Sequence, residues 1–101
     1  MITKDQFFKN VANLPNTIIS VKQHKRYTII SIKGNKCKGK RESGSCFEIN
    51  LDALYNAYID NEKVDTKTLL DGKYIIERKR SPSIAIMISA GLIDSDGYCN
   101  K

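Results

Sequence analysis

Positive charge is concentrated in one window of this chain, and it defines the chemistry that the chain can offer. Positions 22 to 41 contain no Asp or Glu. The cations of this window are Lys22, Lys25, Arg26, Lys33, Lys36, Lys38, Lys40 and Arg41. They contribute eight positive charges, whereas the net charge of the whole chain is +6. The basicity is therefore local, and a local basic surface is what a polyanion binds.

The segment GNKCKGKRESGS, residues 34–45, is the first candidate for ligand contact. Its three glycines and scarcity of apolar residues predict a loop. Glycines let the backbone approach a ligand closely, and the lysines with Arg41 pair with phosphates. The segment is not a P-loop, because Gly39 is followed by Lys40 and Arg41 where that motif requires Lys and Ser or Thr. The alternative is a solvated loop whose lysines serve solubility.

A second basic segment precedes the last predicted helix. Arg78, Lys79 and Arg80 come directly before Ser81-Pro82-Ser83, in which Ser81 is a suitable N-cap and proline fits the first helical position. A helix N-terminus presents free N–H groups and a positive dipole, so it attracts anions. The hydroxyls of Ser81 and Ser83 add donors. The alternative is that Glu77 and solvent screen the three positive charges, so that the cluster needs no ligand.

Residues typical of catalysis or metal binding are few. His24 is the only histidine, and no carboxylate or nucleophile stands at a spacing that implies catalysis. Cys37, Cys46 and Cys99 show neither CxxC spacing nor a nearby histidine pair. Cationic neighbours of Cys37 favour its thiolate form. We therefore expect no catalytic residue, no metal and no cofactor.

Hydrophobic periodicity indicates the elements that position the basic segments. The predicted helices cover residues 4–13, 51–60, 65–70 and 81–90, and the predicted strands cover residues 17–22, 26–33 and 46–51. In the strand 26–33, Tyr27, Ile29 and Ser31 lie on one face, and Thr28, Ile30 and Ile32 on the other. Asn50 and Asp52 are both possible caps of the helix that follows the third strand.

This order predicts an α+β fold in a single domain over residues 1–101. We expect an N-terminal helix and a three-stranded antiparallel sheet with a basic hairpin and loop. Two or three further helices pack on one face of the sheet. The chain is 41% hydrophobic, which suffices for one modest core. No apolar run reaches the length of a membrane span or a signal peptide, so we expect a cytoplasmic protein with reduced thiols and no membrane partner.

The hypothesis with the best support from these features is a small non-catalytic nucleic-acid-binding protein. DNA or RNA is the expected partner, contacted mainly through phosphates. The proposed contact residues are Lys22, Lys25, Arg26, Lys33, Lys36, Lys38, Lys40, Arg41, Arg78, Lys79, Arg80, Ser81 and Ser83. One alternative is a protein–protein adaptor, or a phage or mobile-element accessory protein, that docks on an acidic partner. Another is a small toxin-type ribonuclease, for which His24 offers little support.

Overall fold

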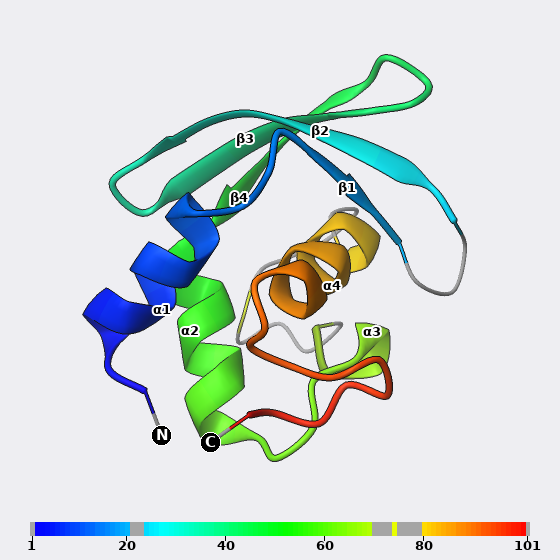
Figure 1. Cartoon of the computed structure of the whole chain (residues 1–101). Coiled ribbons are helices and arrows are strands. Elements are labelled where there is room, and N and C mark those ends of the chain that lie inside the picture. Colours follow the sequence, from blue (N-terminus) through cyan, green and yellow to red (C-terminus); the bar gives the residue numbers. More distant parts are fainter. Residues whose placement is uncertain (1, 21–23, 70–73, 75–79, 101) are drawn as a thin grey trace.

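One antiparallel sheet with helices on one of its faces makes up the described chain (Figure 1). The computed structural model describes residues 2–20, 24–69, 74 and 80–100. The elements in chain order are α1 (Lys4–Ala12), β1 (Thr17–Ile19), β2 (Arg26–Lys33), β3 (Lys36–Arg41), β4 (Cys46–Asn50), α2 (Leu51–Asp60), α3 (Thr66–Leu69) and α4 (Arg80–Ser89). The α+β class is confirmed, with four helices and four strands described. No helix among the described residues is long and apolar enough to cross a membrane.

The sheet has four strands where the sequence predicted three. Its order is β1-β2-β3-β4, and each strand pairs antiparallel with the next. The additional strand is β3, which lies within the segment predicted to be a loop. Its exposed lysines alternate with the buried Cys37 and Gly39. The alternation has the period of a strand, but its inner residues are too small to resemble an ordinary apolar strand.

Gly39 has a packing role on β3. A Cβ atom at this position would lie 2.4 Å from the Phe47 ring and 2.9 Å from the backbone oxygen of Thr28. The ring of Phe47 therefore occupies the space that a side chain at position 39 would need. Of the three glycines in the predicted loop, Gly34 and Gly44 have positive φ angles of 57° and 94°. These two serve tight turns, whereas Gly39 allows close packing between strands.

A β-bulge changes the faces predicted for β2. The register shifts between Ile29 and Ser31. Before the shift Tyr27 and Ile29 are buried, as predicted. After it, Ile32 pairs with the buried Cys37 and packs against the core, whereas Ile30 is 57% exposed. The prediction that Ile30 and Ile32 share a face was wrong, because the extra residue of a bulge inverts the alternation beyond it.

Capping residues set the ends of the helices. Thr3 accepts a hydrogen bond from the backbone N–H of Gln6 and caps α1. Asn50, one of the two predicted candidates, caps α2 by accepting from the N–H groups of Asp52 and Ala53. At the end of α4, Gly91 has a φ of 75°, and the N–H of the following residue reaches back into the last turn. This αL glycine terminates the helix.

The last helix begins one residue earlier than predicted. Arg80 is the first residue of α4, so Ser81 and Pro82 lie within its first turn. Ser81 is therefore not the N-cap. Between α3 and α4, Tyr74 is described and is buried.

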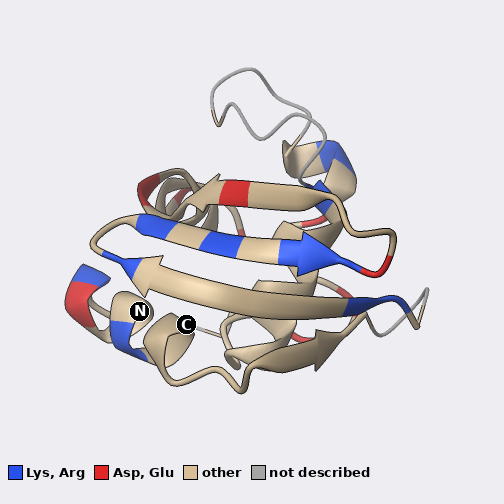
Figure 2. Cartoon of the chain, turned by 90° about the horizontal axis from the view of Figure 1, so that it is seen from above, with Lys and Arg blue, Asp and Glu red and all other residues tan. Residues whose placement is uncertain are grey.

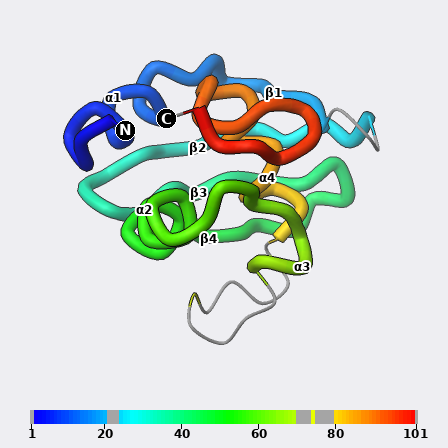
Figure 3. The backbone as a smooth tube through the Cα atoms, turned by 90° about the horizontal axis from the view of Figure 1, so that it is seen from below, coloured from blue at the N-terminus to red at the C-terminus, as the bar shows by residue number. Residues whose placement is uncertain are grey.

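The hydrophobic core lies between the sheet and the helices. Seen from below, the helices and the C-terminal segment lie across the inner face of the sheet (Figure 3). The ring of Phe7 on α1 lies with its centre 5.3 Å from that of Tyr55 and 5.5 Å from that of Tyr58, both on α2. Leu51 and Leu54 on the same helix are fully buried. The described helices all pack on this inner face. The outer face of the sheet is therefore not covered by any described element.

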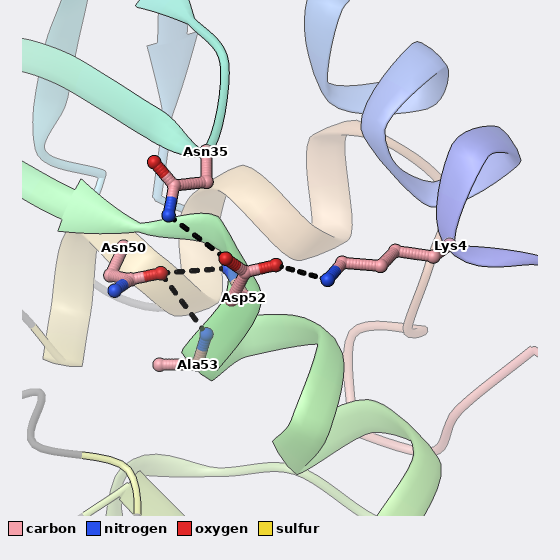
Figure 4. A network of polar contacts seen from close by, with 5 residues as sticks. All are labelled: Lys4, Asn35, Asn50, Asp52 and Ala53. Carbon is pink, nitrogen blue, oxygen red and sulfur yellow. Dashed lines mark hydrogen bonds and ion pairs between the residues drawn. The ribbon is translucent and has the colours of Figure 1, made fainter.

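Asp52 joins three elements near the N-terminus of α2 (Figure 4). Its carboxylate lies 2.6 Å from the Nζ atom of Lys4 on α1. It also accepts a 2.8 Å hydrogen bond from Nδ2 of Asn35, in the turn between β2 and β3. The hydrogen bond from Lys4, with a second from Asn35, holds the pKa of Asp52 below its ordinary value. The network therefore favours the ionised carboxylate in the folded state.

Asp52→Asn is expected to lower the free energy of unfolding at neutral pH by up to about 1 kcal/mol, because this ion pair is partly exposed. The pKa of Asp52 is lower in the folded state than in the unfolded chain. Its contribution is therefore complete above the unfolded-state pKa of about 3.9 and is lost as pH falls through the folded-state value. Urea unfolding of both proteins at pH 7 and at acidic pH measures this difference.

The matched variant for this experiment is Lys4→Gln. If the ion pair carries the effect, the double variant with Asp52→Asn and Lys4→Gln is no less stable than either single variant. A difference between Asp52→Asn and the unmodified protein that persists unchanged at low pH would contradict the proposed role of the charge.

Candidate functional site

The outer face of the sheet presents a row of lysines. Lys36, Lys38 and Lys40 alternate along β3 and are exposed. From above, blue segments recur along this strand and no helix crosses over the sheet (Figure 2). In the register of the sheet, Lys40 lies between Thr28 of β2 and Cys46 of β4. We call this surface, defined by its three lysines, the lysine face.

Glu48 is the acidic neighbour of two of these lysines. Its carboxylate oxygens lie 3.6 Å from Nζ of Lys36 and 3.7 Å from Nζ of Lys38. All three side chains are more than 40% exposed, so each pair contributes little to stability. One carboxylate shared by two ammonium groups leaves an excess of positive charge, to which Lys40 adds. A polyanion can therefore compete with Glu48 for these lysines.

A pocket lies at one end of the sheet. It has a volume of about 370 Å³ and is lined by Lys25, Arg26, Tyr27, Arg41, Glu42, Ser43, Arg80, Ser81 and Pro82. We call it the end pocket. The antiparallel register brings its parts together, because Arg41 at the end of β3 pairs with Tyr27 near the start of β2. The first turn of α4 supplies the remaining side.

Backbone contacts and one ring hold the sheet side of the end pocket. The N–H of Arg41 donates to the carbonyl of Ser45, and the N–H of Gly44 donates to the carbonyl of Arg41, which closes the turn between β3 and β4. The guanidinium of Arg41 lies 5.4 Å from the centre of the Phe47 ring. Burial raises the pKa of the Tyr27 phenol, although the charge of Arg41 opposes the shift. Tyr27 is therefore a neutral hydroxyl donor at physiological pH.

The residues predicted from the sequence fall into two groups in space. Arg80 and Ser81 do meet part of the first basic window, since they line the end pocket with Lys25, Arg26 and Arg41. The lysine face shares none of the residues that line the end pocket and holds Lys36, Lys38 and Lys40, with the exposed Lys33 opposite Lys36. Ser83 is fully buried, so we leave it out of both surfaces. Lys22, Arg78 and Lys79 lie outside the described residues.

Sequence reasoning did not find several residues of these surfaces. Ile19 and Ile30 are 51% and 57% exposed on the outer face. Glu42, Ser43 and Pro82 line the end pocket. The turn sequence around Gly44 indicated where Glu42 and Ser43 lie along the chain. Only the strand register shows which other elements lie beside that turn.

The cysteines and the histidine take positions that offer little chemistry. Cys37 is fully buried on the inner face, and burial raises the pKa of its thiol to about 11. The prediction that its cationic neighbours favour the thiolate was wrong, because those lysines point to the opposite face. Cys46 is exposed. His24 lies exposed next to the start of β2, with a φ of 52°. Within the described ranges, no three His, Cys, Asp or Glu side chains gather where they could hold a metal ion.

Comparisons with protein-family models, with curated proteins and with solved structures each returned no match. Functional inference for this chain therefore rests on its own geometry and charge.

Proposed function

We propose that this chain is a non-catalytic nucleic-acid-binding module that places a phosphate backbone along the lysine face. The observation that carries the proposal is the row of Lys36, Lys38 and Lys40 on β3, over which no described helix lies. Alternate residues of a strand are about 7 Å apart and point to the same side. The three ammonium groups therefore form a straight ladder of cations, which suits an extended polyanion.

The strands beside β3 add contacts of a different kind. Thr28 on β2 is an exposed hydroxyl next to Lys40. Ile19 on β1 offers apolar surface to sugars and bases. Tyr98 is the only aromatic residue of the described chain that is more than half exposed, and it lies under Nζ of Lys63, away from this face. Without exposed rings for stacking, recognition depends on phosphates and is largely independent of sequence.

Binding of labelled single-stranded and duplex DNA and RNA, followed by fluorescence anisotropy over a range of salt concentrations, tests the proposal. Each neutralised phosphate contributes about 0.7–0.9 to the slope of log K against log salt, so three contacts predict a slope of about −2 or steeper. Tight binding at low salt that weakens along this slope is the expected result. If none of the four nucleic acids binds at low salt, the proposal is wrong.

An acidic protein partner is the second candidate, and one observation favours it. Ile30 lies beside a shallow hollow of about 380 Å³ lined also by Lys38, Gly39, Cys46, Phe47 and Glu48. An apolar side chain flanked by carboxylates would fit this hollow and the lysines around it. Ile30→Ser separates the candidates, because it removes the apolar contact and keeps every cation. Nucleic-acid affinity within about threefold of the unmodified protein favours the first candidate.

A further inference from the structure

The end pocket gathers cations from three separate parts of the chain. Lys25 directly precedes β2 and Arg26 begins it, whereas Arg41 comes from the end of β3 and Arg80 from the start of α4. Among the described residues, Glu42 is the only acid that lines the pocket. Among the described ion pairs, none involves Lys25, Arg26 or Arg80. Like charges held close together destabilise a fold unless an anion lies between them.

The donors around the pocket match the oxygens of a phosphate group. Three of the four cations are arginines, whose planar guanidinium groups bind phosphate through paired hydrogen bonds. Ser43, Ser81 and the neutral phenol of Tyr27 supply hydroxyls. The positive end of the ten-residue helix α4 faces the same space, although Pro82 contributes no N–H. Because three of the cations lie outside the helix, two of them on strands of the sheet, the site does not depend on the helix end alone.

We propose that the end pocket binds a phosphomonoester group. A monoester carries close to two negative charges and three strong acceptor oxygens, whereas a phosphodiester within a strand carries a single charge. Four cations that converge on one open volume suit the more highly charged and more compact group. Glu42, on the turn beside Arg41, disfavours a second negative group in the pocket. The group belongs either to a nucleic-acid end or to a free nucleotide.

This inference goes beyond the proposed function and uses none of the three lysines of the lysine face. The two surfaces adjoin, because Arg26 alternates with the buried Tyr27 and so faces the outer side, yet it also lines the end pocket. A nucleic-acid strand lying along β3 would reach the end pocket at the Arg41 end of β3. A terminal phosphate would then occupy it.

The test compares oligonucleotides of one sequence that carry a phosphate at the 5′ end, at the 3′ end or at neither end. We expect a terminal phosphate to raise affinity by about tenfold, the effect of one additional charge-assisted hydrogen-bonded contact. Separate titrations with inorganic phosphate and with a nucleoside monophosphate are followed by amide NMR shifts. Shifts confined to residues around Arg41, Ser43 and Ser81 identify the pocket as the binding site.

Two variants with opposite expected effects on phosphate binding distinguish a loss of the binding site from a loss of folding. Arg26→Gln with Arg80→Gln is expected to abolish the preference for a terminal phosphate. Glu42→Gln removes the acid and is expected to strengthen phosphate binding by roughly two- to fivefold. Lys38→Gln is the matched control, because it should weaken binding of phosphorylated and unphosphorylated oligonucleotides equally.

The outcomes separate this inference from the proposed function. A preference for a terminal phosphate supports binding of a nucleic-acid end. Shifts at the pocket caused by inorganic phosphate or the mononucleotide, without any oligonucleotide binding, support a free phosphomonoester and contradict the proposed function. Equal affinity for all three oligonucleotides, together with no shifts at the pocket, overturns the inference whether or not nucleic acid binds elsewhere.

Discussion

Replacing Lys36, Lys38 and Lys40 together with glutamine is expected to lower nucleic-acid affinity by roughly a hundredfold at low salt. The slope of log K against log salt should become shallower by about two to three units, because up to three phosphate contacts are lost. Glutamine is polar and only one atom shorter than lysine, and these side chains are exposed, so the temperature of unfolding should change little. Anisotropy titrations and thermal unfolding measure the two effects separately.

The matched control removes the same charge from the other side of the molecule. Lys9, Lys63 and Lys67 are exposed residues in or between the helices, and their triple replacement by glutamine should weaken binding far less. Glu48→Gln removes the carboxylate beside Lys36 and Lys38 and should raise affinity. Equal losses in the two triple variants would mean that net charge alone, and not the lysine face, drives binding.

Gly39→Ala is expected to lower the free energy of unfolding by about 2–3 kcal/mol, the upper part of the usual range for an overpacked core. The new methyl group would lie 2.4 Å from the Phe47 ring and 2.9 Å from the backbone oxygen of Thr28. The ring is confined in turn by Tyr27, whose ring centre lies 6.0 Å away. Neither neighbour can move without disturbing the inner face of the sheet. Urea unfolding followed by circular dichroism measures the loss.

Two further variants distinguish this clash from a general cost of replacing glycine. At Gly44 a Cβ atom would have no heavy atom within 4 Å, so Gly44→Ala should show only the smaller cost of a φ of 94°. Phe47→Leu shortens the obstructing side chain, so the double variant with Gly39→Ala should lose less stability than the sum of the two single variants. Strict additivity would contradict the proposed packing role.

Local patterns determined the elements whose buried residues are large. The helical spacing of Leu51, Leu54 and Tyr58 predicted α2 with its observed bounds, and the β-branched run from Arg26 to Lys33 predicted β2. In these segments the spacing of the large apolar residues, which are buried on folding, shows which face of the element is buried. The cap of α2 was one of two candidates in the sequence, because a helix end needs a nearby side chain to satisfy its N–H groups, whereas Ser81 lies inside α4 and does not cap it.

Only the tertiary structure decided what β3 is. Its inward residues are Cys37 and Gly39, whose sequence signal is that of a loop. They form a strand because β2 and β4 satisfy the backbone on both sides and the Phe47 ring fills the space at Gly39. The bulge beyond Ile29 likewise depends on pairing with the neighbouring strand, which no pattern within β2 records.

The sequence by itself determined that positive charge is concentrated in two segments, because charge is a property of residue types. Where that charge lies in space was decided by strand register and by the packing of α4. Register separates Lys36, Lys38 and Lys40 from Arg41, and the position of the helix brings Arg80 to the Arg41 end of the sheet. Residues 39 positions apart meet because both the sheet and the helix bury apolar faces against one core, a condition that no local stretch of sequence contains.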